Sequence, residues 1–392
     1  MMLAAVSIPA LDPVGLPAPP ALFVFLQLLT VLLHLLFMNF VLGGSVLALG
    51  LNVAALAGRR EAHPIANLIH QAMPPMISMA VTMGVAPLLF VQVLYGPFFY
   101  SANVLLGFAW FSFVVVLLVG FYLTYWLTYR GSNALQRRTG AWDDKPLRRL
   151  AVGVLTTAGF LWIAWVLTNN HEMSIHPNLW ADGDAWRSPR WFVPSATTIP
   201  RFLHNVVGAT AIAGLWLAAI GWWRVRRGTG EPEAQFGMIR LGLIVAAVLS
   251  TIQVIVGLYF LLSLDRGVMW ELLGFRTFLG GIWSVTLLIA LLLPLGMGYA
   301  AKHVRRFSWF AMSAGAGVLV TAGMLCGHEQ VRTSSLARIE PEGFSLDQWT
   351  VYPQWTNVVL FALVLVGGLA LVGLMLYWIT DRTATETAGS TD

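Results

Sequence analysis

The side chains best suited to chemistry are eight histidines, several of which lie in strongly apolar sequence. His34 stands in VLLHLLFMNFVLGGSVLALG, residues 31–50, among Leu, Phe and Val side chains. An imidazole in such surroundings finds no water, so it needs a hydrogen bond, another polar side chain or a metal as its partner. A hydrogen bond is the usual outcome for a single buried histidine, so a ligand role needs support from the rest of the chain.

The elements that would position these histidines are membrane-spanning helices. Of the 392 residues, 58% are hydrophobic and 10% are charged, and the mean hydropathy is +0.74. That is too few charges to cover a soluble globule of this size. The net charge of +5 does not predict a nucleic-acid partner, because most Lys and Arg residues fall in short loops between apolar spans.

The fold class we predict is an all-α polytopic membrane protein, with two four-helix bundles in a possible parallel repeat and one C-terminal helix. The nine expected spans lie at about 21–57, 65–96, 102–129, 148–170, 199–223, 236–262, 272–300, 308–327 and 356–380. We divide the chain into a non-cytoplasmic segment (1–20), a first helical bundle with spans 1–5 (21–223), spans 6–8 (224–327), an outer loop (328–355), the ninth span (356–380) and a cytoplasmic tail (381–392).

Loop charge predicts the orientation of these spans. With the N-terminus outside, sixteen of the 23 Lys and Arg residues fall in inner segments, as the positive-inside rule requires. Residues 1–20 contain no Lys or Arg, so they lack the basic region of a signal peptide. The outer loops are then 97–101, 171–198, 263–271 and 328–355, and the two long ones are rich enough in Trp to form a lid or a docking surface.

Two similar segments suggest an internal repeat. GVLTTAG at 153–159 and GVLVTAG at 317–323 are each followed by a His–Glu pair, His171–Glu172 and His328–Glu329. The spacing from glycine to histidine differs by seven residues, about two helical turns, so the copies are not in strict register. A chance match in Gly- and Ala-rich sequence is the alternative. We expect both carboxylates to be solvated in the loops, with proton delivery from outside as the competing interpretation, and we expect none in the helix interiors.

The predicted topology gathers His34, His171, His204 and His328 in the outer half of the membrane, with His176 in the adjacent loop. Zinc fits this set poorly because the residues come from separate helices without a thiolate. Copper or di-iron carboxylate centres need Asp or Glu side chains that face inward, and we expect none in the helix interiors. Haem b fits better, since it needs only one or two axial groups per iron and an apolar, aromatic pocket.

Two further residues bear on a haem. Arg276, near the outer end of the seventh span, is placed to pair with a haem propionate, and an interfacial arginine is its alternative role. Cys326 is the single cysteine, which excludes an internal disulfide and the paired-cysteine attachment of a c-type haem.

At these residues the chain resembles subunit I of the cytochrome bd quinol oxidases. HLLFMNFVLGG at 34–44 is similar to the first helix of that family, which carries a haem-ligating histidine, and RFLH at 201–204 to its fifth helix, whose histidine binds the low-spin haem. Three other segments resemble the family's GVATG, ANGWMQ-P and Phe-Arg-x-Met stretches in the same order: GVAPLLFVQVLYG (84–96), TNNHEMSIHP (168–177) and GFRTF (274–278). The similarity covers most of the chain. It implies axial haem ligands at His34 and His204. His328 stands where the family has a ligand Glu at the end of the eighth span, and because imidazole is the better iron ligand we expect it to ligate too, with His171 in reserve.

The departures from the family pattern are also informative. Phe278 stands where the family has a ligand Met, so His204 loses its expected partner. Met269, His171 or His176 would replace it, or this haem would be five-coordinate or missing. Gln92 stands where the family has a Glu near its high-spin haems, and a neutral amide is a poor iron ligand. The long quinol-binding loop of the family is replaced by about nine residues, 263–271, so we expect no quinol site.

The sequence therefore predicts a haem b-containing membrane oxidoreductase subunit. One to three haem b groups are expected, with a haem d-like or second high-spin haem as a further option. Electrons would pass between these haems and a c-type cytochrome or another outer-side redox protein, with or without oxygen reduction. A pure electron-transfer cytochrome b subunit and a haem-free transporter or channel are the alternatives. The resemblance implies a bacterial or archaeal cytoplasmic membrane, a cytoplasmic C-terminus and a second membrane subunit.

Overall fold

The computed structural model describes residues 8–130, 146–180, 191–340 and 343–388, with side chains as far as Met375. Nine of its described helices are long and apolar enough to cross a membrane, as predicted. These are α1 (Pro20–Leu56), α2 (Ala62–Leu105), α3 (Gly107–Arg130), α5 (Pro146–Ile175), α6 (Thr198–Arg226), α7 (Pro232–Ser263), α9 (Phe278–Lys302), α10 (Phe307–Leu336) and α11 (Trp355–Ala388). The short helices are α8 (Arg266–Leu273), η1 (Pro177–Leu179) and η2 (Leu346–Gln348).

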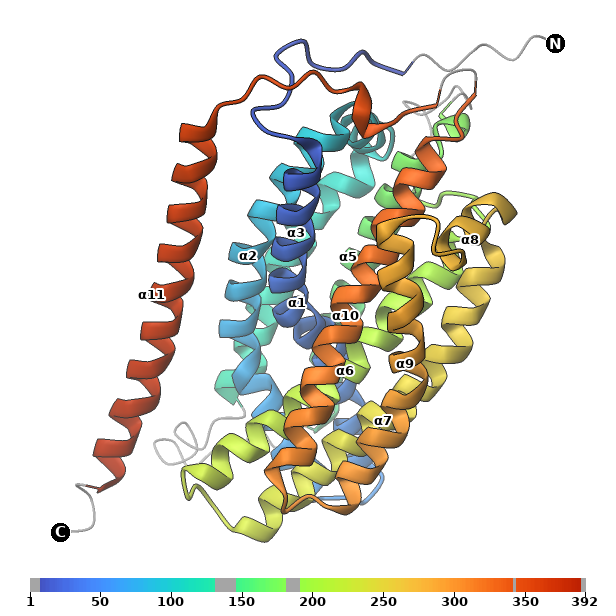
Figure 1. Ribbon diagram of the computed structural model, residues 1–392. Coiled ribbons are helices and arrows are strands. Elements are labelled where there is room, and N and C mark those ends of the chain that lie inside the picture. The colour runs from blue at the N-terminus through green and yellow to red at the C-terminus, as the bar shows by residue number, and fades with distance from the viewer. Residues whose placement is uncertain (1–7, 131–145, 181–190, 341–342, 389–392) are drawn as a thin grey trace.

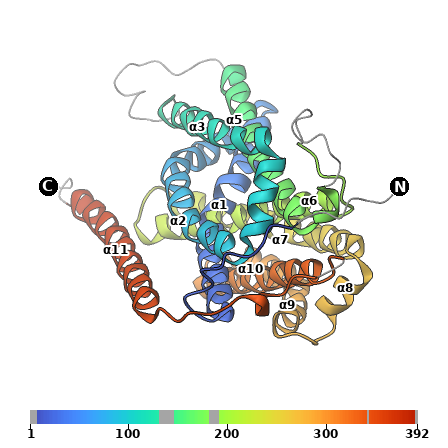
Figure 2. The ribbon, with the colours of Figure 1, turned by 90° about the horizontal axis from the view of Figure 1, so that it is seen from above.

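The membrane-spanning helices form two groups of four, with α11 standing apart (Figures 1 and 2). In one group α1 packs against α2, and α3 against α5; in the other, α6 packs against α7, and α9 against α10. The two groups meet mainly through α1 and α6. This arrangement confirms the predicted fold class. Helix α6, which we assigned with residues 21–223, packs most extensively against α7, so by contact it belongs to the second group.

The tight pairing of α6 and α7 depends on two glycines. A Cβ atom at Gly214 would lie 2.7 Å from the carbonyl oxygen of Gly242, and one at Gly242 would lie 2.5 Å from the carbonyl oxygen of Gly214. Small residues at such a crossing let two helix backbones approach closely. The contact fixes the position of α6, which carries His204, relative to α7.

The predicted boundaries of all four outer loops are wrong. The link predicted at 263–271 contains helix α8 and extends to Thr277, because α9 begins only at Phe278. Residues 97–101 are helical, because α2 continues through Pro97 to Leu105 and only Leu106 separates it from α3. Proline removes a backbone hydrogen bond and bends a helix, and the bend appears here as a non-helical Tyr95 (φ −126°, ψ 27°). Helix α5 extends to Ile175 and α10 to Leu336, so both His–Glu pairs lie on helices and not in loops.

We call the end of the molecule that carries residues 8–19 and 343–354 the upper end, as drawn in Figure 1. These two segments are joined by backbone hydrogen bonds between Leu16 and both Thr350 and Tyr352, each 2.8 Å long. The indole of Trp349 donates to the carbonyl oxygen of Leu94 at 3.2 Å. Part of the predicted lid, 343–354, therefore does cover the upper ends of the helices, whereas 181–190 of the other Trp-rich loop lies outside the described residues.

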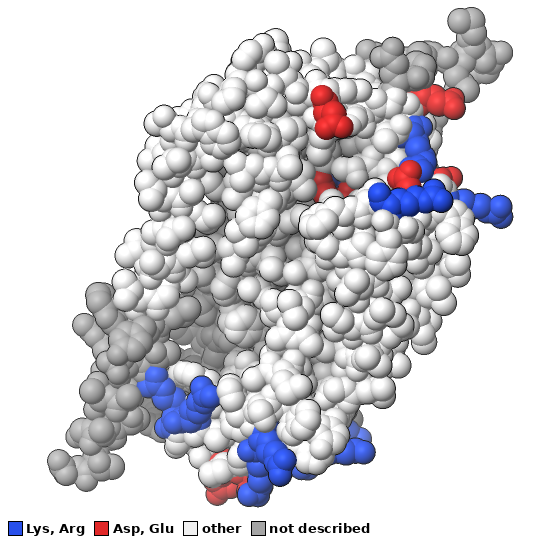
Figure 3. Space-filling view, in the orientation of Figure 1, with Lys and Arg blue, Asp and Glu red and all other residues white. Residues whose placement is uncertain are grey.

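Basic side chains gather at the opposite, lower end, as Figure 3 shows for one face. Three of the sixteen inner basic residues, Arg137, Arg138 and Lys145, lie outside the described part of the chain. Helix α1 begins at the upper end and α11 runs down to the lower end (Figure 1), as an odd number of spans requires.

Candidate functional site

The two His–Glu pairs meet near the upper end, between α5 and α10. The ring centres of His171 and His328 are 4.3 Å apart, with an angle of 35° between the ring planes. A metal ion with one imidazole nitrogen on each side, at about 2 Å, would hold the ring centres about 6 Å apart. The two rings therefore pack directly against each other in a tilted arrangement, too close to hold a metal ion between them. The Nε2 atom of His171 is buried and has no hydrogen-bond partner among the described residues.

Each histidine is followed by a buried carboxylate that binds an arginine. The carboxylate of Glu172 accepts one hydrogen bond from Nε of Arg201 and another from Oγ1 of Thr197, both 2.5 Å long. The Nδ1 atom of His176, on the half-buried ring just after α5, lies 3.4 Å from the same carboxylate. The Glu172 side chain is 0% exposed and that of Arg201 is 5% exposed, so this is a buried ion pair.

The second carboxylate, Glu329, has more partners from distant parts of the chain. It accepts a short hydrogen bond from the hydroxyl of Tyr95, one of 3.2 Å from Nε2 of Gln27, and one of 3.1 Å from Nη1 of Arg332. The guanidinium carbon of Arg332 also lies 4.8 Å from the centre of the Tyr95 ring. The bend of α2 at Tyr95 thus aims its hydroxyl at α10.

The expectation that Glu172 and Glu329 are solvated loop carboxylates is wrong, as is the expectation of no carboxylate inside the helices. Both are buried on helices and paired with arginine. Moving such charges out of water costs several kcal/mol per ion, unless an oppositely charged partner and hydrogen bonds offset this desolvation cost. Buried ionisable groups at membrane depth commonly mark functional sites. Because a carboxylate can also exchange a proton with a hydroxyl, these groups can hold or relay protons.

His204 lies one helical turn after Arg201 on α6 and belongs to the same cluster. Its Nδ1 atom is buried without a described partner, and so is Nη2 of Arg201. The Phe260 ring on α7 lies against both side chains, 6.1 Å from the imidazole centre and 4.7 Å from the guanidinium carbon. Gly257, one turn earlier on α7, adjoins the imidazole, since a Cβ atom there would lie 3.3 Å from His204 Cε1.

His34 is held separately, near the middle of α1. Its Nδ1 atom lies 2.8 Å from the carbonyl oxygen of Ala80 on α2 and donates a hydrogen to it. This tautomer leaves the lone pair on Nε2, as in metal-ligating histidines, whose other nitrogen commonly donates to a backbone carbonyl. A Cβ atom at Gly84 would lie 3.0 Å from Nδ1, so the glycine leaves room for the ring.

The remaining predicted residues surround this cluster less closely. Met269 is partly buried in an apolar cluster that includes Phe260, the ring packed against His204. Gln92 is partly buried on α2, three residues before Tyr95. Arg276 is exposed, and Phe278 is 83% exposed, so its ring points away from the interior.

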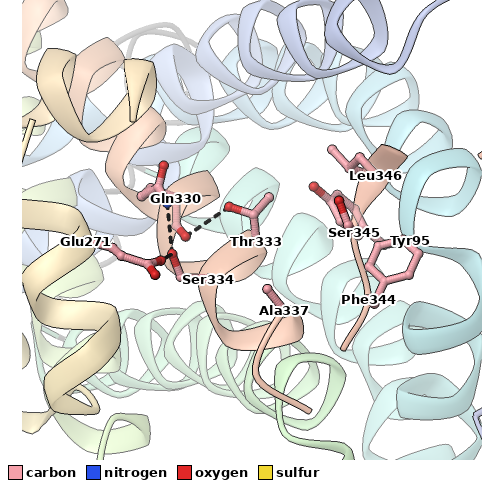
Figure 4. Close-up of a pocket in the computed structure, with 9 residues that line it drawn as sticks. All are labelled: Tyr95, Glu271, Gln330, Thr333, Ser334, Ala337, Phe344, Ser345 and Leu346. Atoms are coloured by element: carbon pink, nitrogen blue, oxygen red, sulfur yellow. Dashed lines mark hydrogen bonds between the residues drawn. The ribbon is translucent and has the colours of Figure 1, made fainter. Parts of the chain in front are cut away.

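A pocket of about 290 Å³ opens at the upper end, beside the Glu329 cluster (Figure 4). One wall is the last turns of α10, and the other is Tyr95 with residues 344–346. Glu271 of α8 also lines it and accepts hydrogen bonds from Ser334 at 2.5 Å and from Nη1 of Arg338 at 3.2 Å. The hydrogen bond from Arg338 holds the pKa of the Glu271 carboxyl below its ordinary value of 4.5. Partial burial acts in the opposite direction and raises this pKa, whereas the hydrogen bond from Ser334 also lowers it.

Sequence reasoning missed four partners in this cluster: Gln27, Tyr95, Thr197 and Arg332. Two weak signals were present. Gln27 is a polar residue in an apolar span, two turns before His34 on the same helix face, and Arg332 follows Glu329 by three residues, a spacing that places both on one side of a helix. Among the described residues, no three His, Cys, Asp or Glu side chains converge as a metal-ion site.

Comparison with known proteins supports the fold. The solved structure of bd oxidase from Geobacillus thermodenitrificans superimposes with a TM-score of 0.62 and 11% sequence identity, covering 96% of this chain and 100% of that chain. Neither a family model nor a curated protein sequence matches this chain. At this identity the likeness shows the fold alone, and it confirms that the chain has the bd oxidase-like fold that the sequence predicted.

Proposed function

We propose that this protein is a haem b-containing membrane oxidoreductase subunit, which transfers electrons between a redox partner at the upper end and haems held in that half of the membrane. The observation that carries the proposal is the pair of buried imidazole nitrogens without described partners, Nε2 of His171 and Nδ1 of His204, in a bd oxidase-like fold. Leaving a buried polar atom unpaired costs about 1–3 kcal/mol. A bound group that accepts a lone pair removes this cost.

The donor set fits haem better than a bare metal ion. Each haem iron needs only one or two axial side chains, and a haem iron gains or loses one electron in electron transfer. His204 would ligate from α6 through Nδ1, and one member of the adjacent pair, His328 of α10 or His171 of α5 with its unpaired Nε2, would ligate a haem near it. His34 would use Nε2, because Ala80 occupies its other nitrogen.

The buried arginine Arg201 supplements Arg276 as a candidate partner for haem propionates. Its Nε atom is taken by Glu172, but Nη2 has no described partner and is fully buried next to His204. A guanidinium is the preferred donor to a carboxylate in such surroundings. Arg276 is exposed and would meet a propionate only at the surface.

Oxygen reduction would need protons as well as electrons, and the Glu329 cluster can supply them. Tyr95 lines the upper pocket (Figure 4). Its hydroxyl donates a hydrogen to Glu329. Glu329 adjoins His328 in sequence. We infer that a proton from the upper side would enter through Tyr95 and Glu329, so oxygen chemistry at this site would not pump protons across the membrane.

The partner would be a c-type cytochrome or another redox protein on the side of the upper end, which we infer from loop charge to be the outside of a bacterial or archaeal cytoplasmic membrane. The described link between α7 and α9, residues 264–277, consists mainly of the short helix α8. This short link supports a protein donor over quinol. A second membrane subunit, as in the bd oxidases that the sequence resembles, would cover part of the exposed apolar surface.

A pyridine haemochrome spectrum of the purified protein tests the proposal. We expect haem b in the unmodified chain and reduced haem content in His204→Ala, and also in His171→Ala or His328→Ala, whichever supplies the ligand. His303→Ala is the matched control, because that imidazole lies at the lower end and its Nδ1 contacts the carbonyl oxygen of Tyr299 at 2.9 Å. A flat Soret region in the intact chain would refute the proposal and favour a haem-free transporter or channel.

Oxygen uptake with a reduced c-type cytochrome then separates the two oxidoreductase versions. Uptake that depends on Glu329 supports oxygen reduction at this site. Haem reduction without uptake identifies a pure electron-transfer subunit.

A further inference from the structure

A second pocket, which we call the groove, lies at the lower end between α7 and α9, at the opposite end of both helices from the histidine cluster. Its volume is about 500 Å³. Its lining is Arg240, Ile244, Ala247 and Val248 from α7, and Gly298, Ala301 and Lys302 from α9. Apolar side chains therefore form the walls, and two cations stand at one end.

The apolar part of this groove opens sideways, toward the region that lipid would occupy. Ile244 and Val248 are 46% and 53% exposed, although both lie on a helix apolar enough to span a membrane. On the facing helix, a Cβ atom at Gly298 would meet no other atom within 4 Å. The missing side chain at this position keeps the groove open between the two helices.

The charged end of the groove is not neutralised by its surroundings. Arg240 and Lys302 are both exposed, and the described lining contains no carboxylate. The Nε atom of Arg240 donates to the carbonyl oxygen of Ala301 at 3.3 Å, which holds the guanidinium at the rim. The acid in the first turn of α7, Glu233, forms its ion pair with Arg305.

We propose that this groove binds an anionic phospholipid, with the phosphate between Arg240 and Lys302 and an acyl chain along Ile244, Val248 and Gly298. The order of groups in the groove, cations at the helix ends and apolar walls deeper in, matches the order of groups along a phospholipid. Basic pockets between membrane helices are known to bind anionic headgroups. A free phosphate would use only the cations, and a protein helix would leave the two charges unpaired.

Native mass spectrometry of the full chain in mild detergent tests the charged end. We titrate phosphatidylglycerol and, separately, phosphatidylcholine with the same acyl chains, and we expect preferential retention of phosphatidylglycerol. The double variant R240Q/K302Q should weaken phosphatidylglycerol binding roughly 30-fold, about fivefold for each cation. The control R59Q/R60Q removes the same charge from another exposed lower-end loop and should have little effect.

A pair of glycine variants tests the apolar part without changing charge. Gly298→Leu should fill the groove and reduce phosphatidylglycerol binding, whereas Gly296→Leu, at an exposed position that does not line the groove, should not. Leucine favours a helix over glycine, so both variants should fold. Three results would each overturn the proposal: equal binding of both lipids, equal effects of the two leucines, or displacement of the lipid by inorganic phosphate at matched concentration.

Discussion

The ion pair of Glu172 and Arg201 predicts a large and specific loss of stability on Glu172→Ala. Both side chains are buried, with exposures of 0% and 5%, and the Nε–Oε1 distance is 2.5 Å. Removing one partner of a buried pair leaves an uncompensated charge and costs about 3–5 kcal/mol. The matched control is Glu233→Ala, which removes a pair whose members are 73% and 71% exposed. Exposed pairs contribute only about 0.2–1 kcal/mol.

The assay is unfolding by SDS titration in mixed micelles, followed by the fluorescence of the 17 tryptophans. Glu172→Ala should lower the free energy of unfolding by at least about 2 kcal/mol more than Glu233→Ala. The double variant Glu172→Ala/Arg201→Ala should be more stable than Glu172→Ala alone, because no unpaired charge is left buried. Equal losses in the two single variants, or additive losses in the double variant, would refute the reasoning.

Two further predictions follow from single contacts. The Glu271–Arg338 pair should stabilise the fold fully above pH 4.5, the ordinary carboxyl pKa, and its contribution should vanish as the pH falls through the lowered pKa of the folded state. The unfolding midpoints of the unmodified chain and of Glu271→Gln should therefore converge on acidification. A difference between the midpoints that persists at low pH would contradict this. Gly84→Val should displace the ring of His34, because a Cβ atom there would lie only 3.0 Å from Nδ1. This variant should lower the haem content in the pyridine haemochrome assay. The control Gly367→Val should leave it unchanged, because a Cβ atom at that position meets nothing within 4 Å.

The number and grouping of the helices could be predicted because they depend on properties that the sequence states locally. An apolar run of about 20 residues has to become a helix in lipid, since every backbone group must be paired within the segment. Short connections then make consecutive helices neighbours, which gives α1–α2 and α6–α7. Helix ends were less predictable: hydropathy marks where apolar residues stop, and α5 and α10 continue beyond that point through polar residues.

The partners of the buried carboxylates could not be predicted in the same way. Gln27 and Tyr95 reach Glu329 from 302 and 234 residues away along the chain. Such contacts depend on how each helix is rotated about its axis, and a helix that is apolar nearly all round carries no clear signal for that rotation. The bend before Pro97, which turns Tyr95 toward α10, is a tertiary detail of this kind.

The two His–Glu pairs show which part of the proposed repeat the fold aligns. The seven-residue difference in spacing shifts the GVLTTAG and GVLVTAG segments by about 10.5 Å along their helices relative to the histidines. The histidines nevertheless meet, with ring centres 4.3 Å apart. The arginine partners also differ in origin, since Arg201 comes from the next helix and Arg332 from the same helix three residues on. A copied segment would preserve spacing and partner together, whereas here only the chemistry is preserved: an imidazole beside a carboxylate bound to a guanidinium. The likeness between the two motifs therefore lies in the chemistry of their side chains and not in the register of the flanking segments.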